Sequence, residues 1–314
     1  MKKTILILFL IANFSKGYSF NCNSPDLDVT VNECIAINDM YISLGIAESN
    51  LPENILNSWG SDISDQVCEA NNGFITKGIH CDNFQRVTKL SLSSSDLTGS
   101  IPSSIGNLIN LTDLYLHKNQ ITGKIPVEIG DLDNLSLLAL SENQLSGSIP
   151  SEIGRLSSLN YLYLFDNRLT GYIPPEIGNI PFLLDLELNN NSITGIIPPE
   201  IGNLTFVSDI NISNNLITGM IPPEIDNLVN LGALNMQNNY IFGEFPDIRS
   251  TPIEHYGGLS FNNNCISPNQ NQEVNNWVNL RVNEGMGFNA QRPHFKECSE
   301  FYNGYDLIFI DSFD

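Results

Sequence analysis

The chain has 314 residues, of which 41% are hydrophobic and only 16% are charged. Its 35 acidic residues outnumber the 14 basic ones, which gives a formal charge of −21. The apolar fraction is too high for a disordered chain. The negative charge argues against nucleic acid or anionic lipid as a partner, because both attract Lys and Arg. The length predicts two ordinary domains or one elongated repeat domain.

The first residues have the layout of a secretory signal peptide. Lys2 and Lys3 precede an apolar run over residues 5–11, and small and polar residues follow before Phe20. The run is too short to span a bilayer, and no later apolar stretch reaches that length. We therefore assign residues 1–19 to a signal peptide and expect a secreted, extracellular protein without a membrane span.

Six cysteines fit an oxidising compartment, because an even number in an exported chain suggests disulfide bonds. Pairing of sequence neighbours is the simplest arrangement, although six cysteines allow 15 pairings. A metal site built from Cys68, His80 and Cys81 is the alternative, but the spacing is not that of a zinc ribbon, and three ligands do not close a structural site. We expect no cofactor. The simplest pairs are Cys22–Cys34, Cys68–Cys81 and Cys265–Cys298.

From Val87 onward the sequence repeats every 24 residues, in seven units. Each unit contains a Leu-x-x-Leu-x-Leu segment, in some units with Val, Ile or Met in place of a Leu, followed by a recurring glycine and an Ile-Pro-type pair. An asparagine recurs in six of the seven units, and the first unit has Ser95 in its place. This period and pattern indicate a leucine-rich repeat. The six asparagines are Asn119, Asn143, Asn167, Asn191, Asn215 and Asn239.

Each recurring residue has a physical role in this architecture. The leucines alternate with period two, so they point inward from a short strand. The asparagine amide offers donors and an acceptor to the backbone where the chain turns out of the strand, and repetition forms a ladder. Glycine tolerates a backbone conformation closed to other residues, and proline stops extension of the strand.

The pattern predicts an α/β solenoid with a parallel concave β-sheet, an irregular or 3-10 convex side, and disulfide-capped ends. Residues 20–86 are expected to form an N-terminal cap with a helix around residues 37–44, and residues 87–254 the seven repeats. Residues 255–314 are expected to contain a partial eighth repeat, with a strand at Tyr256 that includes Leu259, and then the C-terminal cap and tail.

The segment Leu-x-Gly-x-Ile-Pro-x-x-Ile-Gly resembles the plant-specific class of leucine-rich repeats. That class occurs in ectodomains of plant receptor kinases and in polygalacturonase-inhibiting proteins. The region from Cys34 through Trp59 and Cys68 to Cys81 is similar to their N-terminal caps, and the resemblance covers residues 34–266. The coils are fewer than usual and no kinase follows. The signal peptide and the tail 306–314 resemble those of bacterial exported proteins, which indicates a bacterial secreted member as a further possibility.

Side chains between the inward leucines are expected to face solvent on the concave side. Aromatic residues gather there in the second and fourth units, and acidic residues follow in the fifth and sixth. Adjacent exposed aromatics are typical binding anchors, although tyrosine and phenylalanine also simply suit strands. The predicted partner-binding residues are Tyr115, His117, Leu137, Tyr161, Tyr163, Phe165, Asp185, Glu187 and Asp209.

The sequence predicts a secreted, non-catalytic recognition module that binds a protein or peptide through the concave face. A carbohydrate binder, or an inhibitor of an extracellular polysaccharide-degrading enzyme, is one alternative. A structural or adhesive surface protein is another. We find no nucleophile elbow, no His-Glu-x-x-His and no phosphate loop, and the four histidines are scattered. We therefore assign no catalytic residue.

Overall fold

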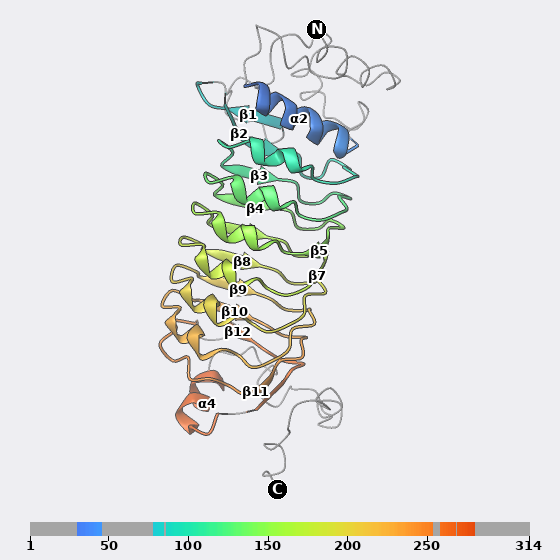
Figure 1. The fold of residues 1–314 in the computed structure, drawn as a ribbon. Helices are drawn as coiled ribbons and strands as arrows, with labels where there is room; N and C mark the ends of the chain where they lie inside the picture. Colours follow the sequence, from blue (N-terminus) through green and yellow to red (C-terminus); the bar gives the residue numbers. More distant parts are fainter. Residues whose placement is uncertain (1–29, 46–77, 85, 254–257, 268, 280–314) are drawn as a thin grey trace, which may run out of the picture.

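The computed structural model of the chain describes residues 30–45, 78–84, 86–253, 258–267 and 269–279. These residues form an elongated solenoid of stacked coils (Figure 1). Successive coils contribute one strand each to a nine-stranded sheet. In spatial order its strands are β1 (Gly78–Cys81), β2 (Val87–Ser91), β3 (Asp113–Tyr115), β4 (Leu137–Ala139), β6 (Tyr161–Tyr163), β8 (Asp185–Glu187), β9 (Asp209–Asn211), β10 (Ala233–Asn235) and β12 (Leu259–Ser260).

The strands from β2 to β12 pair in parallel, which confirms the predicted sheet. The first pair differs, because β1 runs antiparallel to β2. The two strands are joined by a tight turn in which the Asp82 carboxylate accepts hydrogen bonds from the Phe84 and Arg86 amides. So short a connection permits only an antiparallel pair. The sequence pattern gave no indication of this strand, since it lies before the first repeat.

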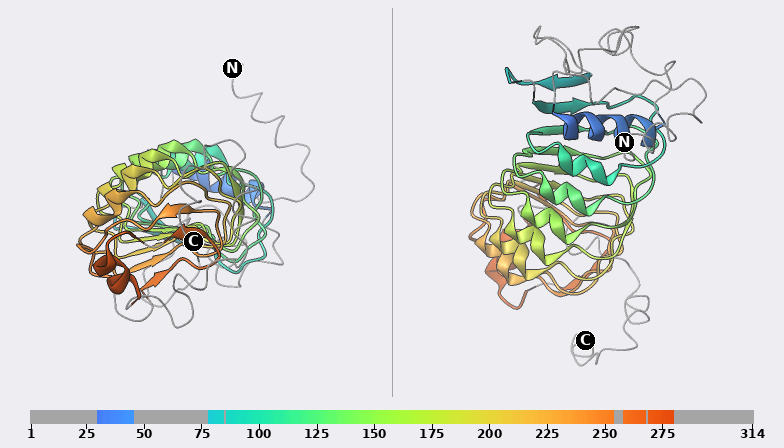
Figure 2. Two further views of the ribbon diagram at one scale, coloured as in Figure 1. Left: turned by 90° about the horizontal axis from the view of Figure 1, so that it is seen from below. Right: turned by 45° about the horizontal axis from the view of Figure 1, so that its top comes forward.

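The side opposite the sheet carries a column of short 3-10 helices (Figure 2). Each helix begins directly after the repeat proline, whose extended conformation ends the preceding segment. Short strand pairs line one flank, β5 (Ser146–Ser148) with β7 (Arg168–Thr170) and β11 (Phe242–Glu244) with β13 (Cys265–Ser267). The 3-10 helices are η2 (Ser103–Asn107), η3 (Val127–Asp131), η4 (Ser151–Arg155), η5 (Pro175–Asn179), η6 (Pro199–Asn203) and η7 (Pro223–Asn227).

The inward leucines and isoleucines stack coil on coil into one continuous core. In the second unit, Leu111, Leu114, Leu116 and Ile121 are all fully buried. One coil cannot bury its own apolar side, so the stacking itself supplies the stability. The seven repeat glycines have φ between 76° and 88°, a region that favours glycine, as the sequence predicted.

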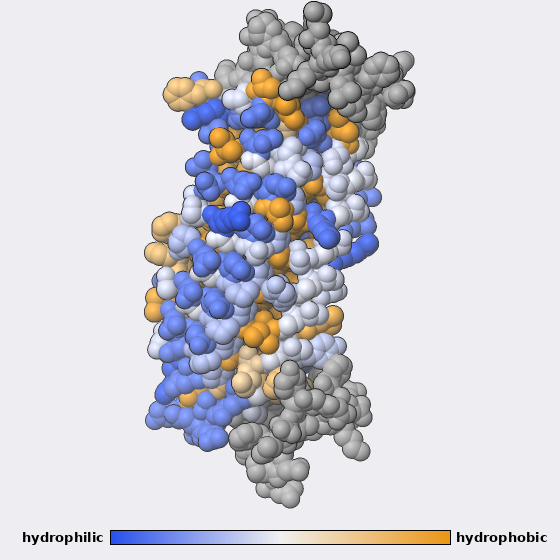
Figure 3. Space-filling model, viewed as in Figure 1, coloured by the Kyte–Doolittle hydropathy of each residue, from blue (hydrophilic) through white to orange (hydrophobic). Residues whose placement is uncertain are grey.

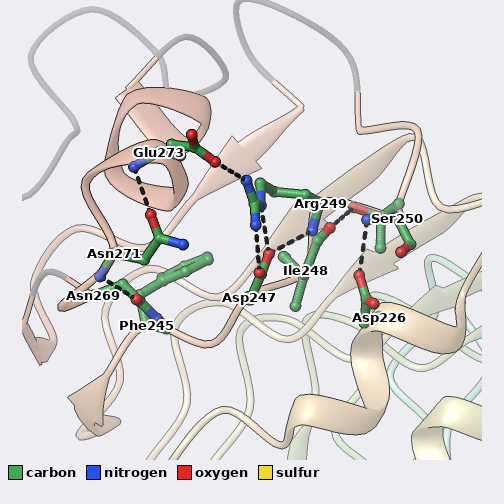
Figure 4. Close-up of polar contacts among 10 residues, drawn as sticks. Asp226, Phe245, Asp247, Ile248, Arg249, Ser250, Asn269, Asn271 and Glu273 are labelled. Carbon is green, nitrogen blue, oxygen red and sulfur yellow. Dashed lines mark hydrogen bonds and ion pairs between the residues drawn. The ribbon is translucent and has the colours of Figure 1, made fainter.

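A second set of repeat glycines, one within each of the first five 3-10 helices, allows successive 3-10 helices to pack closely. A Cβ atom added at Gly178 would lie 2.2 Å from the carbonyl oxygen of Glu200 in the next coil. The last helix, η7, has Asp226 at this position, and its carboxylate accepts a hydrogen bond from the Ser250 amide at 2.8 Å (Figure 4). The glycine is thus required only where another 3-10 helix packs against it.

The predicted asparagine ladder is present and nearly identical in each coil. The Asn215 Oδ1 atom accepts from the Ile193 amide of the preceding coil at 3.0 Å. Its Nδ2 atom donates to carbonyls on both coils, those of Leu188 at 3.0 Å and Ile212 at 3.1 Å. Asn264 extends the ladder into the partial eighth repeat.

The N-terminal end of the core is covered by α2 (Val31–Ser43), as predicted. Thr30 and Glu33 form a capping box at its first turn. The buried Glu33 carboxylate also accepts a hydrogen bond from the Val87 amide at 3.0 Å, which joins the helix to the first strand of the repeats. Ile37, Met40 and Leu44 are buried against the first coil, as the helical spacing predicted, but the outer side of the helix is not uniformly polar, because Ile35 and Ile42 are exposed.

The other end of the core is covered by α4 (Gln272–Asn279), which the sequence did not predict. Arg249 joins this helix to the last coil (Figure 4). Its guanidinium donates to both carboxylate oxygens of Asp247, each at 2.8 Å. It also donates to one carboxylate oxygen of Glu273 at 3.0 Å. These contacts lower the pKa of Asp247. Val274 and Val278 are buried and close the core.

Several predictions concern residues outside the described ranges, namely the signal peptide, Trp59, the tail 306–314, and Cys22, Cys68 and Cys298. The cysteines within the described ranges, Cys34, Cys81 and Cys265, are each in a disulfide bond. Which cysteine pairs with which stays a prediction.

Replacement of Asn215 by Ala tests the ladder. The change leaves the Ile193 amide without its acceptor and removes one of the two donors from each of three carbonyls, in a buried bend. We expect a loss of about 2 to 4 kcal/mol in the free energy of unfolding, measured by urea denaturation. The exposed Asn203→Ala variant is the control and should stay within about 0.5 kcal/mol of the unchanged protein. Equal midpoints for both variants would refute the structural role of the ladder.

Candidate functional site

The outer surface of the nine-stranded sheet, here called the concave face, carries three side-chain columns. The register of the paired strands aligns the residues of the first two columns. One contains Lys89, Asp113, Leu137, Tyr161, Asp185, Asp209 and Ala233. Its neighbour contains Ser91, Tyr115, Ala139, Tyr163, Glu187, Asn211 and Asn235. The third column follows the strands and contains Ser93, His117, Ser141, Phe165, Asn189, Ser213 and Gln237.

Not every outward position is accessible. Ser91, Ala139, Ser141 and Ser213 are buried, although the sequence pattern predicts that they face solvent. Ala139, for example, stands between Tyr115 and Tyr163 of the paired strands, and these larger side chains flank it. The predicted partner-binding residues are all partly exposed, and the structure places them on one continuous surface across β3, β4, β6, β8 and β9.

The aromatic part of this surface, here called the aromatic row, consists of Tyr115, Tyr161, Tyr163 and Phe165. The Tyr161 and Tyr163 ring centroids lie 6.1 Å apart. The Tyr115 ring meets His117 edge-on at the same distance, and the Lys89 Nζ atom lies 4.7 Å from the Tyr115 ring centroid. Leu137 stands in the strand register between Asp113 and Tyr161. The row presents flat, half-buried rings whose rotation is already restricted.

The acidic part, here called the carboxylate group, consists of Asp185, Glu187 and Asp209. It begins where the aromatic row ends, because the Tyr163 hydroxyl donates to Asp185 Oδ2 at 3.0 Å. The Asp209 carboxylate accepts from the Ser208 hydroxyl at 2.8 Å. The aromatic row and the carboxylate group are therefore one connected surface, and the sequence did not predict the bond that joins them.

Burial and nearby negative charge raise the pKa values of Asp185 and Glu187. Burial, followed by the charge of Asp185, raises the pKa of Glu187 to about 7. Burial and the charge of Asp209 also raise the pKa of Asp185, against the hydrogen bond from Tyr163. Burial and the Asp185 charge raise the pKa of the Tyr163 hydroxyl. The carboxylate group is partly buried, and within the described part of the chain none of its members forms an ion pair.

Unsatisfied acceptors lie on the same face. Asp185 Oδ1, Asn189 Oδ1 and Gln237 Oε1 are buried atoms to which the described part of the chain donates no hydrogen bond. Buried polar atoms are normally paired with protein, water or ligand. All three are oxygen atoms that accept hydrogen bonds, so this part of the face is suited to a group rich in N–H donors.

Metal or catalytic chemistry has no comparable support. Within the described ranges, no three His, Cys, Asp or Glu side chains are grouped so as to bind a metal. His117 lies on the concave face, and burial lowers its pKa. The concave face places the aromatic rings beside the carboxylates, and this arrangement is suited to binding.

An exposed pair of phenylalanines beside this face was not predicted from the sequence. Phe182 and Phe206 lie in the loops that enter β8 and β9, with ring centroids 5.7 Å apart. The sequence does mark these two positions, because phenylalanine replaces the asparagine that other units have there, namely Asn110, Asn134 and Asn230.

Comparison with known proteins agrees with the architecture. A leucine-rich repeat family model matches residues 85–145, and a second matches residues 158–180, 182–204 and 207–228. The chain is a leucine-rich repeat protein. No curated protein matches its sequence. Among the described residues, no helix combines the length and apolar character needed to cross a membrane.

Solved structures similar to this leucine-rich repeat protein include ectodomains of plant receptors. The plant peptide hormone receptor RGFR1 in complex with RGF2 is 35% identical with a TM-score of 0.52, over 54% of this chain and 27% of the receptor. PEPR1 with AtPEP1 is 30% identical with a TM-score of 0.64, over 74% and 31%. The HAESA ectodomain from Arabidopsis with an IDA peptide hormone is 27% identical with a TM-score of 0.55, over 73% and 41%. The chain thus spans less than half the length of each of these receptors.

Glu187→Gln tests the electrostatics of the carboxylate group. Its folded pKa of about 7 exceeds the ordinary value of 4.5, so its contribution to stability is present below pH 4.5 and is lost as the pH rises through 7. The variant should be more stable than the unchanged protein at pH 8, by about 1 kcal/mol after allowance for partial exposure. Urea midpoints at pH 4.5 and 8 measure this difference. Exposed Glu176→Gln is the control, and an equal effect of Glu187→Gln at both pH values would contradict the assignment.

Proposed function

We propose that this leucine-rich repeat protein is a secreted, non-catalytic recognition module that binds a peptide or protein segment containing a basic residue. The concave face is the proposed site. The observation that supports this proposal best is the direct connection of the aromatic row to the carboxylate group through the Tyr163–Asp185 hydrogen bond. An extended segment laid along the solenoid would meet flat rings first and carboxylates next.

The charge distribution supports a cationic ligand. Residues 169–248 contain nine acidic residues and no Lys or Arg. A guanidinium or ammonium group near Asp185 and Glu187 would favour their ionised forms and would donate to the unsatisfied acceptor atoms. The aromatic row would supply apolar contact area at low cost in side-chain entropy, because each ring has only two rotatable bonds.

The comparisons support a peptide as ligand. RGFR1 is described as a peptide hormone receptor and the HAESA ectodomain was solved with a peptide hormone. Transfer of this binding mode to the present chain is part of our proposal, because the chain spans only a fraction of those receptors. Secretion is supported by the lysine-led apolar segment at the N-terminus and by the disulfide-bonded cysteines.

Replacement of Tyr161, Tyr163 and Phe165 together by Ala tests the site. Removal of three partly exposed rings should lower the affinity for the partner at least tenfold, because buried aromatic anchors dominate the binding energy at interfaces. The partner is obtained by pull-down with the full chain or by selection from a peptide library, and titration calorimetry measures its affinity.

The matched control is Tyr172→Ala, an exposed tyrosine on the flank strands rather than on the concave face. It should leave the affinity unchanged. Circular dichroism verifies that both variants fold. A folded triple variant with unchanged affinity would refute the concave face as the site, and capture of glycans without any peptide or protein would refute the ligand class.

The affinity for a basic peptide should rise with pH. Below pH 7 the Glu187 carboxyl is protonated in the free protein, so a cation must displace a proton in order to bind. We expect a three- to tenfold tighter Kd at pH 8 than at pH 6 for peptides without histidine, measured by fluorescence anisotropy. Glu187→Gln should weaken binding at pH 8 and flatten this dependence. A steep dependence retained in the variant would contradict the role of Glu187.

A further inference from the structure

Phe182 and Phe206 form an exposed apolar pair at the edge of the concave face. Their side chains are 51% and 50% exposed, and their rings are tilted by 56° to one another at 5.7 Å. Each lies three residues before a member of the carboxylate group, Phe182 before Asp185 and Phe206 before Asp209. Their ring contact makes them one shared apolar surface rather than two scattered side chains.

The repeat shows what the fold itself requires at this position. Three other units have asparagine there, and two of these have a visible role. Asn134 Nδ2 donates to the Ile109 carbonyl at 2.9 Å, and Asn230 Nδ2 donates to the Thr205 carbonyl at 2.7 Å. Phenylalanine cannot donate such a bond and gains little burial in return. The two phenylalanines are therefore not explained by stability.

The backbone holds this pair in a fixed relation to the carboxylates. Asn160 Nδ2 donates to the Phe182 carbonyl at 2.8 Å, and the Asn160 carbonyl accepts from the Leu184 and Asp185 amides. On the next coil, Asn230 holds the Thr205 carbonyl beside Phe206. The Ser208 hydroxyl holds the Asp209 carboxylate. The backbone that carries the two rings and the Asp209 carboxylate is thus held in place by hydrogen bonds.

Each ring stands only three residues before a carboxylate, Asp185 or Asp209, in a stretch of sequence without any Lys or Arg. A neutral apolar partner would leave these carboxylates dehydrated and unpaired, which is costly. A partner that presents an apolar side chain next to a cation satisfies both surfaces. The chemistry of this edge is therefore complementary to a basic-hydrophobic pair of neighbouring residues.

We propose that Phe182 and Phe206 form a specificity subsite that takes a large aliphatic or aromatic ligand side chain adjacent to the basic residue bound by the carboxylate group. This inference rests on the proposed peptide-binding function and adds a sequence requirement to it. The ligand would reach over the edge of the sheet at β8 and β9, in addition to its contacts with the aromatic row.

The experiment is selection of a random dodecapeptide library against the full chain, followed by the same selection against Phe182→Asn/Phe206→Asn. The substitutions restore the residue that the repeat uses elsewhere, so the variant should fold with undiminished stability. The unchanged protein should enrich peptides with Lys or Arg beside a large apolar residue. The variant should still enrich Lys and Arg but lose the apolar preference.

A binding cycle on one enriched peptide gives the quantitative test. Replacement of its apolar residue by Ala should weaken binding to the unchanged protein about tenfold and to the double variant less than twofold, because the contact is already absent there. Tyr172→Ser, an exposed aromatic changed to the serine of other units, is the control and should behave like the unchanged protein.

Two other results would overturn the inference in distinguishable ways. If basic peptides are enriched and the alanine peptide loses equal affinity on both proteins, the subsite is refuted while the proposed function stands. If no basic peptide is enriched, or if the aromatic-row variant binds the enriched peptide as well as the unchanged protein does, the proposed function fails and the subsite fails with it.

Discussion

Every coil of this solenoid must turn out of its strand inside a dry core, where backbone amides and carbonyls find no water. The asparagine ladder meets this constraint, because one side chain accepts from the coil before it and donates to carbonyls of both coils. A coil shifted by one residue would lose these bonds and would turn its leucines outward. The ladder therefore fixes the 24-residue register on which the columns of the concave face depend.

A fixed register separates the residues that build the fold from those that are free to vary. Leucine, asparagine, glycine and proline recur because each coil needs them, whereas the outward strand positions carry no such requirement. Tyr161, Glu187 and Phe182 are departures from the neighbouring coils, and none of them fills the core. Their grouping at β6 and β8 is the basis of the binding site that we propose.

The helical spacing of apolar residues before the repeats predicted the capping helix. The 24-residue period predicted the parallel sheet and its irregular or 3-10 convex side, because these follow from spacing alone. It could not predict which outward residues are accessible, since Ala139 is covered by neighbours from adjacent coils. The bond from Tyr163 to Asp185 also depends on a distance between coils. The antiparallel strand β1 and the helix α4 lie outside the repeat, where periodicity carries no information.

The ionised carboxylates on the concave face lower the stability of the fold, whereas the buried core residues raise it. Glu187 and Asp185 repel each other in a half-buried place, so their ionised forms oppose folding. A neutral polar residue would serve the strand better, and Asn211 and Asn235 occupy the same column in the next coils. Carboxylates that cost stability are retained where binding requires them. A ligand cation at the carboxylates would relieve the repulsion and a neighbouring apolar side chain would cover the exposed rings, so the same ligand would offset both costs.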